Sequence, residues 1–107
     1  VVVGADLDGA ALDVDLQLAV LRIVQEGVAN VRRHARANRC HVTLRDEGAD
    51  LVITVADDGI GPPAVLTAGI GLTSVEQRAK EFGGTTEFGP GAVGSRLRVT
   101  LTKDPPR

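Results

Sequence analysis

The segment VDLQLAVLRIVQEGVANVRRHARA, residues 14–37, determines the fold that we predict for this chain. Its apolar residues recur every three or four positions, as they do on one face of an amphipathic α-helix. That face is formed by Leu21, Val24, Val28, Val31 and Ala35. We therefore predict a helix that starts near Val14, ends near Ala35 and packs against a sheet through this face.

Two polar faces complete the predicted helix. The solvent-exposed face carries Arg22, Gln25, Arg32 and Arg36. A second polar stripe about two turns long carries Glu26, Asn30, Arg33 and His34. Such residues are ordinary on a helix surface, but this helix already has a solvated face. We therefore expect the second stripe to face a polar cleft.

The chemistry of this stripe suits a nucleotide. Glu26 and Asn30 lie one turn apart. Carboxylate and amide oxygens are hard donors that suit Mg²⁺, directly or through its waters. Arg33, one turn further along, is suited to a phosphate group. The stripe therefore makes nucleotide binding the leading hypothesis.

Alternating apolar residues after this helix predict a β-hairpin. Its strands are indicated by Cys40, Val42 and Leu44, and then by Leu51, Ile53 and Val55. A turn at residues 47–49 separates the two strands. The second strand runs into DDGIGPP, residues 57–63, which fits neither a helix nor a central strand. We predict an ordered loop there that opens a site.

The remaining elements complete a mixed sheet. A second helix is predicted over residues 72–82, where Leu72, Val75, Ala79 and Phe82 share a face and two glycines follow. Short strands are predicted at residues 1–3, 85–88 and 96–101. The order βαββαββ predicts an α/β fold, an α+β two-layer sandwich in which helices pack on one face of a mixed β-sheet.

Composition limits the class of protein. The chain has 107 residues, 43% hydrophobic and 24% charged, which suits one soluble domain; we assign residues 1–102 to it and residues 103–107 to a disordered tail. A net charge of −2 argues against direct nucleic-acid binding. One cysteine allows no internal disulfide and fits a reducing cytoplasm. Because the chain has no methionine and begins with valine, we expect it to be part of a longer protein.

The two glycine-rich loops allow an ordinary and a ligand-binding interpretation. Asp57, Gly59 and Gly61 are common in turns, but they also let a planar base lie against the backbone beside a hydrogen-bond-accepting carboxylate. Gly69 and Gly71 precede a helix, where free backbone N–H groups attract phosphate. The lysine and Ser/Thr ending of a Walker loop is missing.

Four motifs together resemble the ATP-binding catalytic domain of sensor histidine kinases. They are EGVANVRRHARA (residues 26–37), DDGIG (57–61), GIGLTSVEQRAKEFGG (69–84) and GSRLRVTL (94–101). The resemblance covers nearly the whole chain and implies the Bergerat-type ATP-binding fold of the GHKL superfamily, shared with the gyrase B subunit and mismatch-repair ATPases. The end of the first motif and the short lid before Gly69 are similar to the nitrate-sensor subgroup, whose response regulators carry helix-turn-helix output domains.

The resemblance implies roles for the helical stripe in binding ATP with Mg²⁺. Glu26 would polarise the attack or a metal-bound water. Asn30 would ligate Mg²⁺, while Arg33 and His34 would lie beside the phosphates. Glu26 and Asn30 are thus the implied catalytic residues.

The resemblance also implies the contacts of the base and the lid. Asp57 would accept a hydrogen bond from the adenine amino group, with Gly59 and Gly61 flanking the base. The lid hinge would be formed by Gly69 and Gly71, with Leu72 covering the base. Two positions depart from the family pattern. Asp58 replaces the usual Asn, which would alter metal or water contacts, and Ser95 replaces the Thr that supports the adenine pocket.

The activity implied is transfer of the ATP γ-phosphate to a histidine on a separate dimerisation domain, for signalling to a response regulator. We expect that phospho-acceptor domain to lie outside this chain, so the isolated domain would be a monomer and its parent a homodimer. The location implied is cytoplasmic, and membrane attachment of the parent is left open. Two alternatives stand beside this hypothesis: an anti-sigma-factor serine kinase of the same fold, and a non-catalytic partner-binding module.

Overall fold

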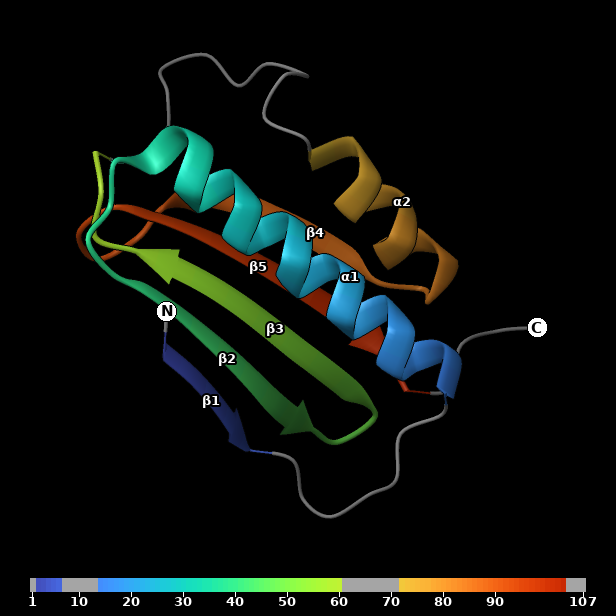
Figure 1. Ribbon diagram of the computed structural model, residues 1–107. Helices are drawn as coiled ribbons and strands as arrows, with labels where there is room; N and C mark the ends of the chain where they lie inside the picture. The colour runs from blue at the N-terminus through green and yellow to red at the C-terminus, as the bar shows by residue number, and fades with distance from the viewer. Residues whose placement is uncertain (1, 7–13, 61–71, 104–107) are drawn as a thin grey trace.

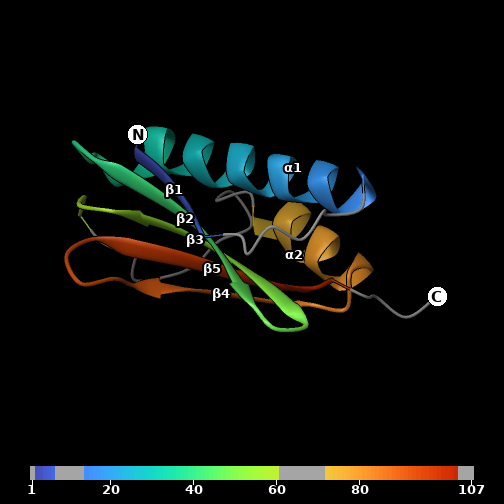
Figure 2. The same cartoon turned by 90° about the horizontal axis from the view of Figure 1, so that it is seen from below.

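The computed structural model describes residues 2–6, 14–60 and 72–103. Within them, two helices lie on one face of a five-stranded sheet, which Figure 2 shows edge-on. The elements are β1 (Val2–Asp6), α1 (Val14–Asn30), a π-helical turn η1 (Val31–Ala35), β2 (Cys40–Glu47), β3 (Asp50–Asp57), α2 (Leu72–Glu81), β4 (Thr85–Pro90) and β5 (Ser95–Thr102). The predicted element order and the two-layer α/β class are confirmed.

The sheet is mixed, as predicted. Its strands are ordered β1-β2-β3-β5-β4 (Figure 1). The edge strand β1 runs parallel to β2, whereas the other neighbours pair antiparallel. The N-terminal strand extends to Asp6, beyond the three residues predicted for it. Parallel pairing of β1 with β2 is possible because α1 provides the crossover between them.

The helix α1 packs through a different part of its apolar surface from the one predicted. Its buried residues are Leu16, Ala19, Val20, Ile23 and Gly27. Leu21, placed on the buried face by the sequence, is 52% exposed, and Val24, Val28 and Val31 are only partly buried. Apolar residues cover two adjacent stripes of this helix at the same spacing, so periodicity alone cannot select the deeper one.

Gly27 explains which stripe is buried. A Cβ atom there would lie 2.9 Å from Cγ2 of Val55 and 3.3 Å from Cδ2 of Leu97. The helix backbone therefore lies so close to β3 and β5 at this point that a larger residue would push the helix away from the sheet. This contact turns Ile23 and Leu16 into the core and leaves the Leu21 stripe at the edge of the contact.

The second helix and its ending agree with the sequence. In α2, Val75 and Ala79 are buried, with Leu72 and Phe82 packed against the same core. Gly83 has φ of +64°, a left-handed conformation that favours glycine at a helix end. The N–H of Gly84 donates to the carbonyl of Ala79 (2.8 Å). A Cβ atom on Gly84 would lie 1.8 Å from the Thr100 carbonyl oxygen, so the chain can enter β4 here only through glycine.

The hairpin of β2 and β3 is confirmed with the turn predicted for it. Glu47 pairs with Asp50, leaving a two-residue loop in which Gly48 has φ of +68°. The sheet face beneath the helices is closed by Leu51, Ile53, Leu97, Val99 and Leu101, all 4% exposed or less.

The last described residue, Lys103, is joined to the hairpin. Its N–H donates to the Ala49 carbonyl (2.8 Å), and its side chain pairs with Asp46. The rest of the predicted tail lies outside the described residues. Among the helices that the structure describes, none is long and apolar enough to cross a membrane.

Candidate functional site

The candidate site lies where α1, β3 and β5 meet at one end of the molecule. The C-terminal end of α1, the C-terminal end of β3 and the start of β5 share this end (Figure 1). The alternating burial of β3 places Val55 in the core and Asp57 two residues later on the same face. The last buried residue of α1, Gly27, contacts Val55, which brings the polar end of the helix toward this strand end.

Asp57 is a buried carboxylate with a defined orientation. The residue is 8% exposed. Its Oδ1 accepts hydrogen bonds from the N–H of Gly59 (2.8 Å) and of Ser95 (3.3 Å). No other described residue donates to the carboxylate, so Oδ2 is available to a ligand. Two backbone donors on one oxygen offset part of the cost of burying the charge.

Gly94 makes this arrangement possible. A Cβ atom there would lie 2.3 Å from Asp57 Oδ1, 2.5 Å from its carbonyl oxygen and 2.6 Å from the Gly59 N. The Gly94 N–H itself donates to the Asp57 carbonyl (3.2 Å). Gly94 lies in the motif of residues 94–101, but no role was predicted for it from the sequence. The only sequence signal for this role of Gly94 was its position directly before a predicted strand.

Asn30 is the last residue of α1 and is half-buried. Its Nδ2 is inaccessible to solvent and has no hydrogen-bond partner among the described residues. A buried amide without a partner costs free energy unless a ligand or water completes it. Glu26, one turn earlier and also half-buried, lies on the same side of the helix. The unpartnered amide of Asn30 and the carboxylate of Glu26 therefore mark this side of the helix as a candidate polar site.

The helix widens directly after Asn30. Residues Val31–Ala35 form η1, and π-helical turns are common at functional sites. The α-helical spacing used to predict the polar stripe therefore ends at Asn30. Arg33 lies in η1 with an exposed side chain, and the side chain of His34 is outside the description. Arg36 then ends the turn with φ of +50°, a left-handed conformation that costs a residue other than glycine about 1 kcal/mol.

Asp58 makes contacts that the sequence did not predict. Its Oδ1 accepts hydrogen bonds from the N–H of Asn38 (2.8 Å) and of Arg39 (2.9 Å). Its own N–H donates to the Arg39 carbonyl (3.3 Å). These bonds, chiefly the one from Arg39, lower the pKa of the Asp58 carboxyl. Asp58 thus fastens the segment after η1 to the end of β3.

The thiol of Cys40, next to Asp57 in the sheet, is made unreactive by its surroundings. Cys40 is 4% exposed and pairs across the sheet with Asp57. Burial, and then the charge of Asp57, raise the pKa of the Cys40 thiol, so it stays protonated at neutral pH.

The remaining predicted site residues divide into two groups. Ser95 is buried and bonded to Asp57 through its N–H, and Leu72 begins α2 half-buried against the core. Gly61, Gly69 and Gly71 lie outside the described residues. The structure therefore links Asp57, Gly59 and Ser95 directly. The C-terminal end of α1, which carries Glu26 and Asn30, lies at the same end of the fold.

The residues present fit a metal that is held mainly by its substrate. Among the described residues, no group of three His, Cys, Asp or Glu side chains could hold a metal ion. The amide of Asn30, with a buried and unpartnered nitrogen, can offer its oxygen as a single protein ligand. Mg²⁺ in phosphate sites commonly takes one or two protein ligands, with phosphates and waters supplying the rest.

The geometry and motifs agree with a known family. The family model described as histidine kinase-, DNA gyrase B- and HSP90-like ATPase matches residues 15–105. The chain belongs to this ATPase family. The match includes the end of α1, the Asp57 loop, α2 and β5, which carry the described part of the site.

Two curated relatives are sensor kinases. The chain is 31% identical over 96 residues to the signal transduction histidine-protein kinase/phosphatase UhpB of Salmonella typhimurium, covering 89% of this chain and 19% of the relative. It is 34% identical over 84 residues to the sensor histidine kinase LiaS of Bacillus subtilis, covering 77% and 23%. The chain thus spans about a fifth of the length of these relatives.

Solved structures share the fold. The blue-light activated histidine kinase EL346 of Erythrobacter litoralis superposes with a TM-score of 0.77 at 25% identity, over 94% of this chain and 34% of that one. The ATP binding domain of PrrB from Mycobacterium tuberculosis superposes with a TM-score of 0.72 at 23% identity, over 100% and 82%. The second likeness concerns the fold alone.

Replacing Gly94 tests the close approach to Asp57. We expect Gly94→Ala to lower the free energy of unfolding by about 1–3 kcal/mol, because the methyl group would overlap backbone and carboxylate atoms that must move apart. Gly89→Ala is the matched control, since a Cβ atom at Gly89 meets nothing within 4 Å. Urea denaturation of both variants measures the effect. Equal stability of the two would show that the Asp57 loop is looser than described.

Acid titration tests the contact of Asp58. A carboxyl with a lowered pKa stabilises the folded state above its unfolded pKa, near 3.8, and this contribution is lost as pH falls through the folded pKa. We expect Asp58→Asn to be less stable than the native chain at neutral pH, with the difference shrinking below pH 3.8. Urea denaturation across this pH range measures it.

Glu76→Gln is the control, because the exposed Glu76 makes no hydrogen bond within the described part of the chain. A stability difference for Asp58→Asn that does not change with pH would contradict the contact.

Proposed function

We propose that this chain is the ATP-binding catalytic part of a sensor histidine kinase, which binds Mg-ATP and transfers the γ-phosphate to a histidine of a separate dimerisation domain. The observation that carries the proposal is Asp57, a buried carboxylate anchored through one oxygen with the other available. A group held in this way is suited to recognise one fixed hydrogen-bond donor, such as the amino group of adenine.

Asp57 serves base recognition in this proposal. Its orientation is set by Gly59 and Ser95, so little side-chain entropy is lost when a base binds. The carboxylate accepts from an amino group and offers no donor to a carbonyl oxygen, which disfavours guanine. Leu72, half-buried at the start of α2, would supply apolar surface to cover the base.

In this proposal, Asn30 and Glu26 act at the phosphate end of the bound nucleotide. The Asn30 amide oxygen would hold Mg²⁺, which supplies neutralisation of phosphate charge when bound. Its buried nitrogen would donate to a ligand oxygen. Glu26, one turn away, would polarise the attacking group or a water. Arg33, exposed in η1, and His34 would lie beside the phosphates.

The proposed reaction is a single phosphoryl transfer. The unprotonated nitrogen of the acceptor imidazole forms a bond to the γ-phosphorus while the bond from that phosphorus to the bridging oxygen breaks. ADP leaves with the electron pair of that bond, and the proton on the other ring nitrogen passes to a base or to water. In such transfers the protein contributes mainly position and charge stabilisation. The chain's part is to hold the base at Asp57 and the phosphates at the end of α1.

Partners follow from the same proposal. The relatives named above are histidine kinases by name, and the matched part is only 19% and 23% of their lengths. This supports a phospho-acceptor and dimerisation domain outside this chain and favours histidine over serine as acceptor. We propose a response regulator with a helix-turn-helix output domain as the downstream partner, since the motif of residues 30–35 is similar to the nitrate-sensor subgroup. We also propose a cytoplasmic site of action and a monomeric isolated domain.

Base selectivity tests the role of Asp57. We expect the native chain to bind ATP more tightly than GTP, and Asp57→Asn to weaken ATP binding by roughly tenfold to a hundredfold, because an amide can present a donor to the adenine amino group. Asp50→Asn, at the first residue of β3 and so at the other end of this strand, is the matched control. Isothermal calorimetry measures both. Equal affinity of the native chain for ATP and GTP would refute the assignment.

Phosphotransfer tests the other end of the nucleotide. We expect Asn30→Ala and Glu26→Gln to slow transfer by about a hundredfold while ADP affinity falls much less, because their contacts serve the transition state more than the ground state. Radiolabelled ATP with a supplied phospho-acceptor domain measures transfer, and calorimetry measures ADP binding. Gln25→Ala, on the neighbouring exposed face, is the control. Native transfer rates in both variants would show that the stripe is only a solvated surface.

A further inference from the structure

A hollow lies beside the end of α1, on the flank away from Glu26 and Asn30. It has a volume of about 310 Å³. Its lining comes from α1, η1, the connection after η1 and the first residue of β2: Val28, Val31, Arg32, Arg36, Ala37, Asn38, Arg39 and Cys40. We call this hollow the arginine-rimmed pocket. Val28 lies about 200° around the helix from both Glu26 and Asn30, so the pocket and the polar stripe occupy different flanks of α1.

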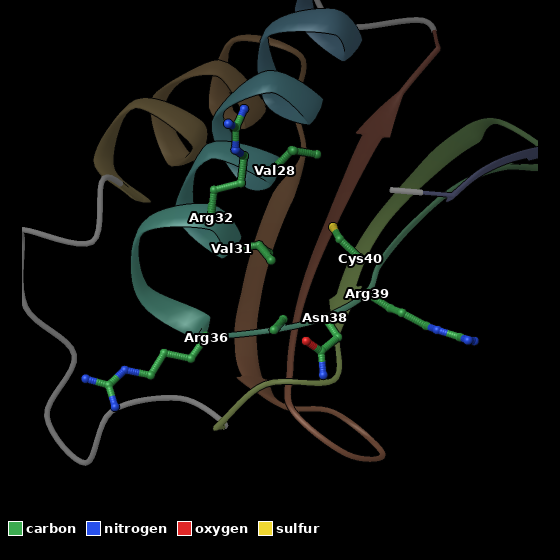
Figure 3. A pocket seen from close by; sticks show the side chains of 8 residues that line it. Val28, Val31, Arg32, Arg36, Asn38, Arg39 and Cys40 are labelled. Carbon is green, nitrogen blue, oxygen red and sulfur yellow. The ribbon is translucent and has the colours of Figure 1, made fainter.

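The floor of the pocket is apolar. Val28 and Val31 are partly buried against the core, and Cys40 is 4% exposed. In Figure 3 their side chains face one another across the hollow. The protonated thiol of Cys40 adds no charge to this floor. The floor therefore suits one apolar side chain of moderate size.

The rim is cationic. Arg32, Arg36 and Arg39 are all exposed, and none forms an ion pair with a side chain of the described residues. Asp58 accepts hydrogen bonds from the backbone N–H groups of Asn38 and Arg39 at its Oδ1. Beyond the backbone hydrogen bond from Arg39, the charge of Arg39 makes a minor further contribution to the lowered pKa of the Asp58 carboxyl, without an ion pair between the two side chains. Four arginines and no acidic residue stand between positions 32 and 39, in a chain whose net charge is −2. The local charge is thus opposite to that of the whole chain.

The directions of the arginines argue against a single small anion as the natural occupant. Figure 3 shows Arg36 and Arg39 extending to opposite sides of the pocket, with Arg32 on a third side. Guanidinium groups that diverge cannot converge on one phosphate or carboxylate. They can each meet a different acidic residue on either side of a central apolar one.

The backbone supports a role for the Arg36 side chain. Arg36 has φ of +50° and ψ of +41°, where glycine would avoid the steric strain. A strained residue at the mouth of a pocket is grounds for a functional hypothesis about its side chain.

From these observations we infer that the arginine-rimmed pocket docks an acidic segment of a partner protein, in which one apolar residue enters the floor and acidic residues on both sides meet the arginines. Charge complementarity selects the partner, because the rim is positive and exposed while the floor is small and apolar. The inference does not depend on the proposed kinase activity, since the lining shares no residue with the predicted nucleotide contacts.

A labelled pentapeptide tests the inference. The probe is a leucine between two pairs of glutamates, with capped ends and a fluorescein label. We expect saturable binding to the native chain by fluorescence anisotropy, with amide shifts in NMR spectra confined to Val28, Val31 and residues 36–40. Replacing the glutamates with glutamine, or the leucine with serine, should abolish saturation at millimolar peptide. Inorganic phosphate alone should not compete.

Variants identify the rim. We expect R32Q/R36G/R39Q to weaken peptide binding by about tenfold, in line with three exposed ion pairs. R45Q/K80Q/R96Q removes three exposed cations from β2, α2 and β5, and should bind as the native chain does. The single change R36G should leave the midpoint of thermal unfolding unchanged or higher, so weaker binding by this variant cannot be ascribed to unfolding.

Several results would overturn the inference. One is the absence of saturable binding to the folded native chain. Another is equal binding by both triple variants, or by the glutamine peptide. Competition by phosphate would assign the pocket to a small anion, and competition by ADP would place the peptide in the nucleotide site instead. Binding of peptide with unchanged affinity in the presence of ADP supports the inference, because the two sites lie on different flanks of α1.

Discussion

The contact of Gly27 with Val55 and Leu97 is the constraint on which the functional surfaces depend. With a Cβ position only 2.9 Å from a valine methyl group, the helix backbone lies directly on the sheet, and this fixes the rotation of α1 about its axis. Rotation decides what each flank presents. One flank offers Glu26 and Asn30 at the end of the sheet where β3 ends and β5 begins. The other offers Val28 to the arginine-rimmed pocket, so both surfaces follow from one glycine contact.

The C-terminal end of β3 depends on a different feature, which is the buried carboxylate of Asp57. Asp57 is tolerated at 8% exposure because backbone N–H groups at Gly59 and Ser95 donate to one oxygen. Those donors reach it only because Gly94 lacks a side chain. An orientation defined by backbone atoms is more rigid than one defined by mobile side chains. Such rigidity is what recognition of a single base edge requires.

Periodicity predicted the elements well and their contacts less well. The helix of residues 14–35, the hairpin with its turn at Gly48 and the second helix follow from local spacing, and the structure contains them. The predicted orientation of α1 was wrong at Leu21, which is exposed. Two apolar stripes of the helix have the same period, and contacts with Val55 and Leu97, which are distant in sequence, determine which stripe is buried. The pairing of Asp57 with Ser95 spans 38 residues, which no local pattern encodes. The roles at Glu26 and Asn30 rest on chemistry and resemblance and remain predictions.

Asp58 shows how a departure from a family pattern can have a structural cause. At this position the resemblance led us to expect altered metal or water contacts, whereas the carboxylate binds the N–H groups of Asn38 and Arg39. An ionised carboxylate accepts both bonds with a full charge and carries no donor of its own, so these bonds are stronger than those to a neutral amide. The segment it holds leads from the strained Arg36 into β2. A charge at position 58 therefore stabilises the turn that ends η1 and keeps this turn in a constant position relative to Asp57 at the end of β3.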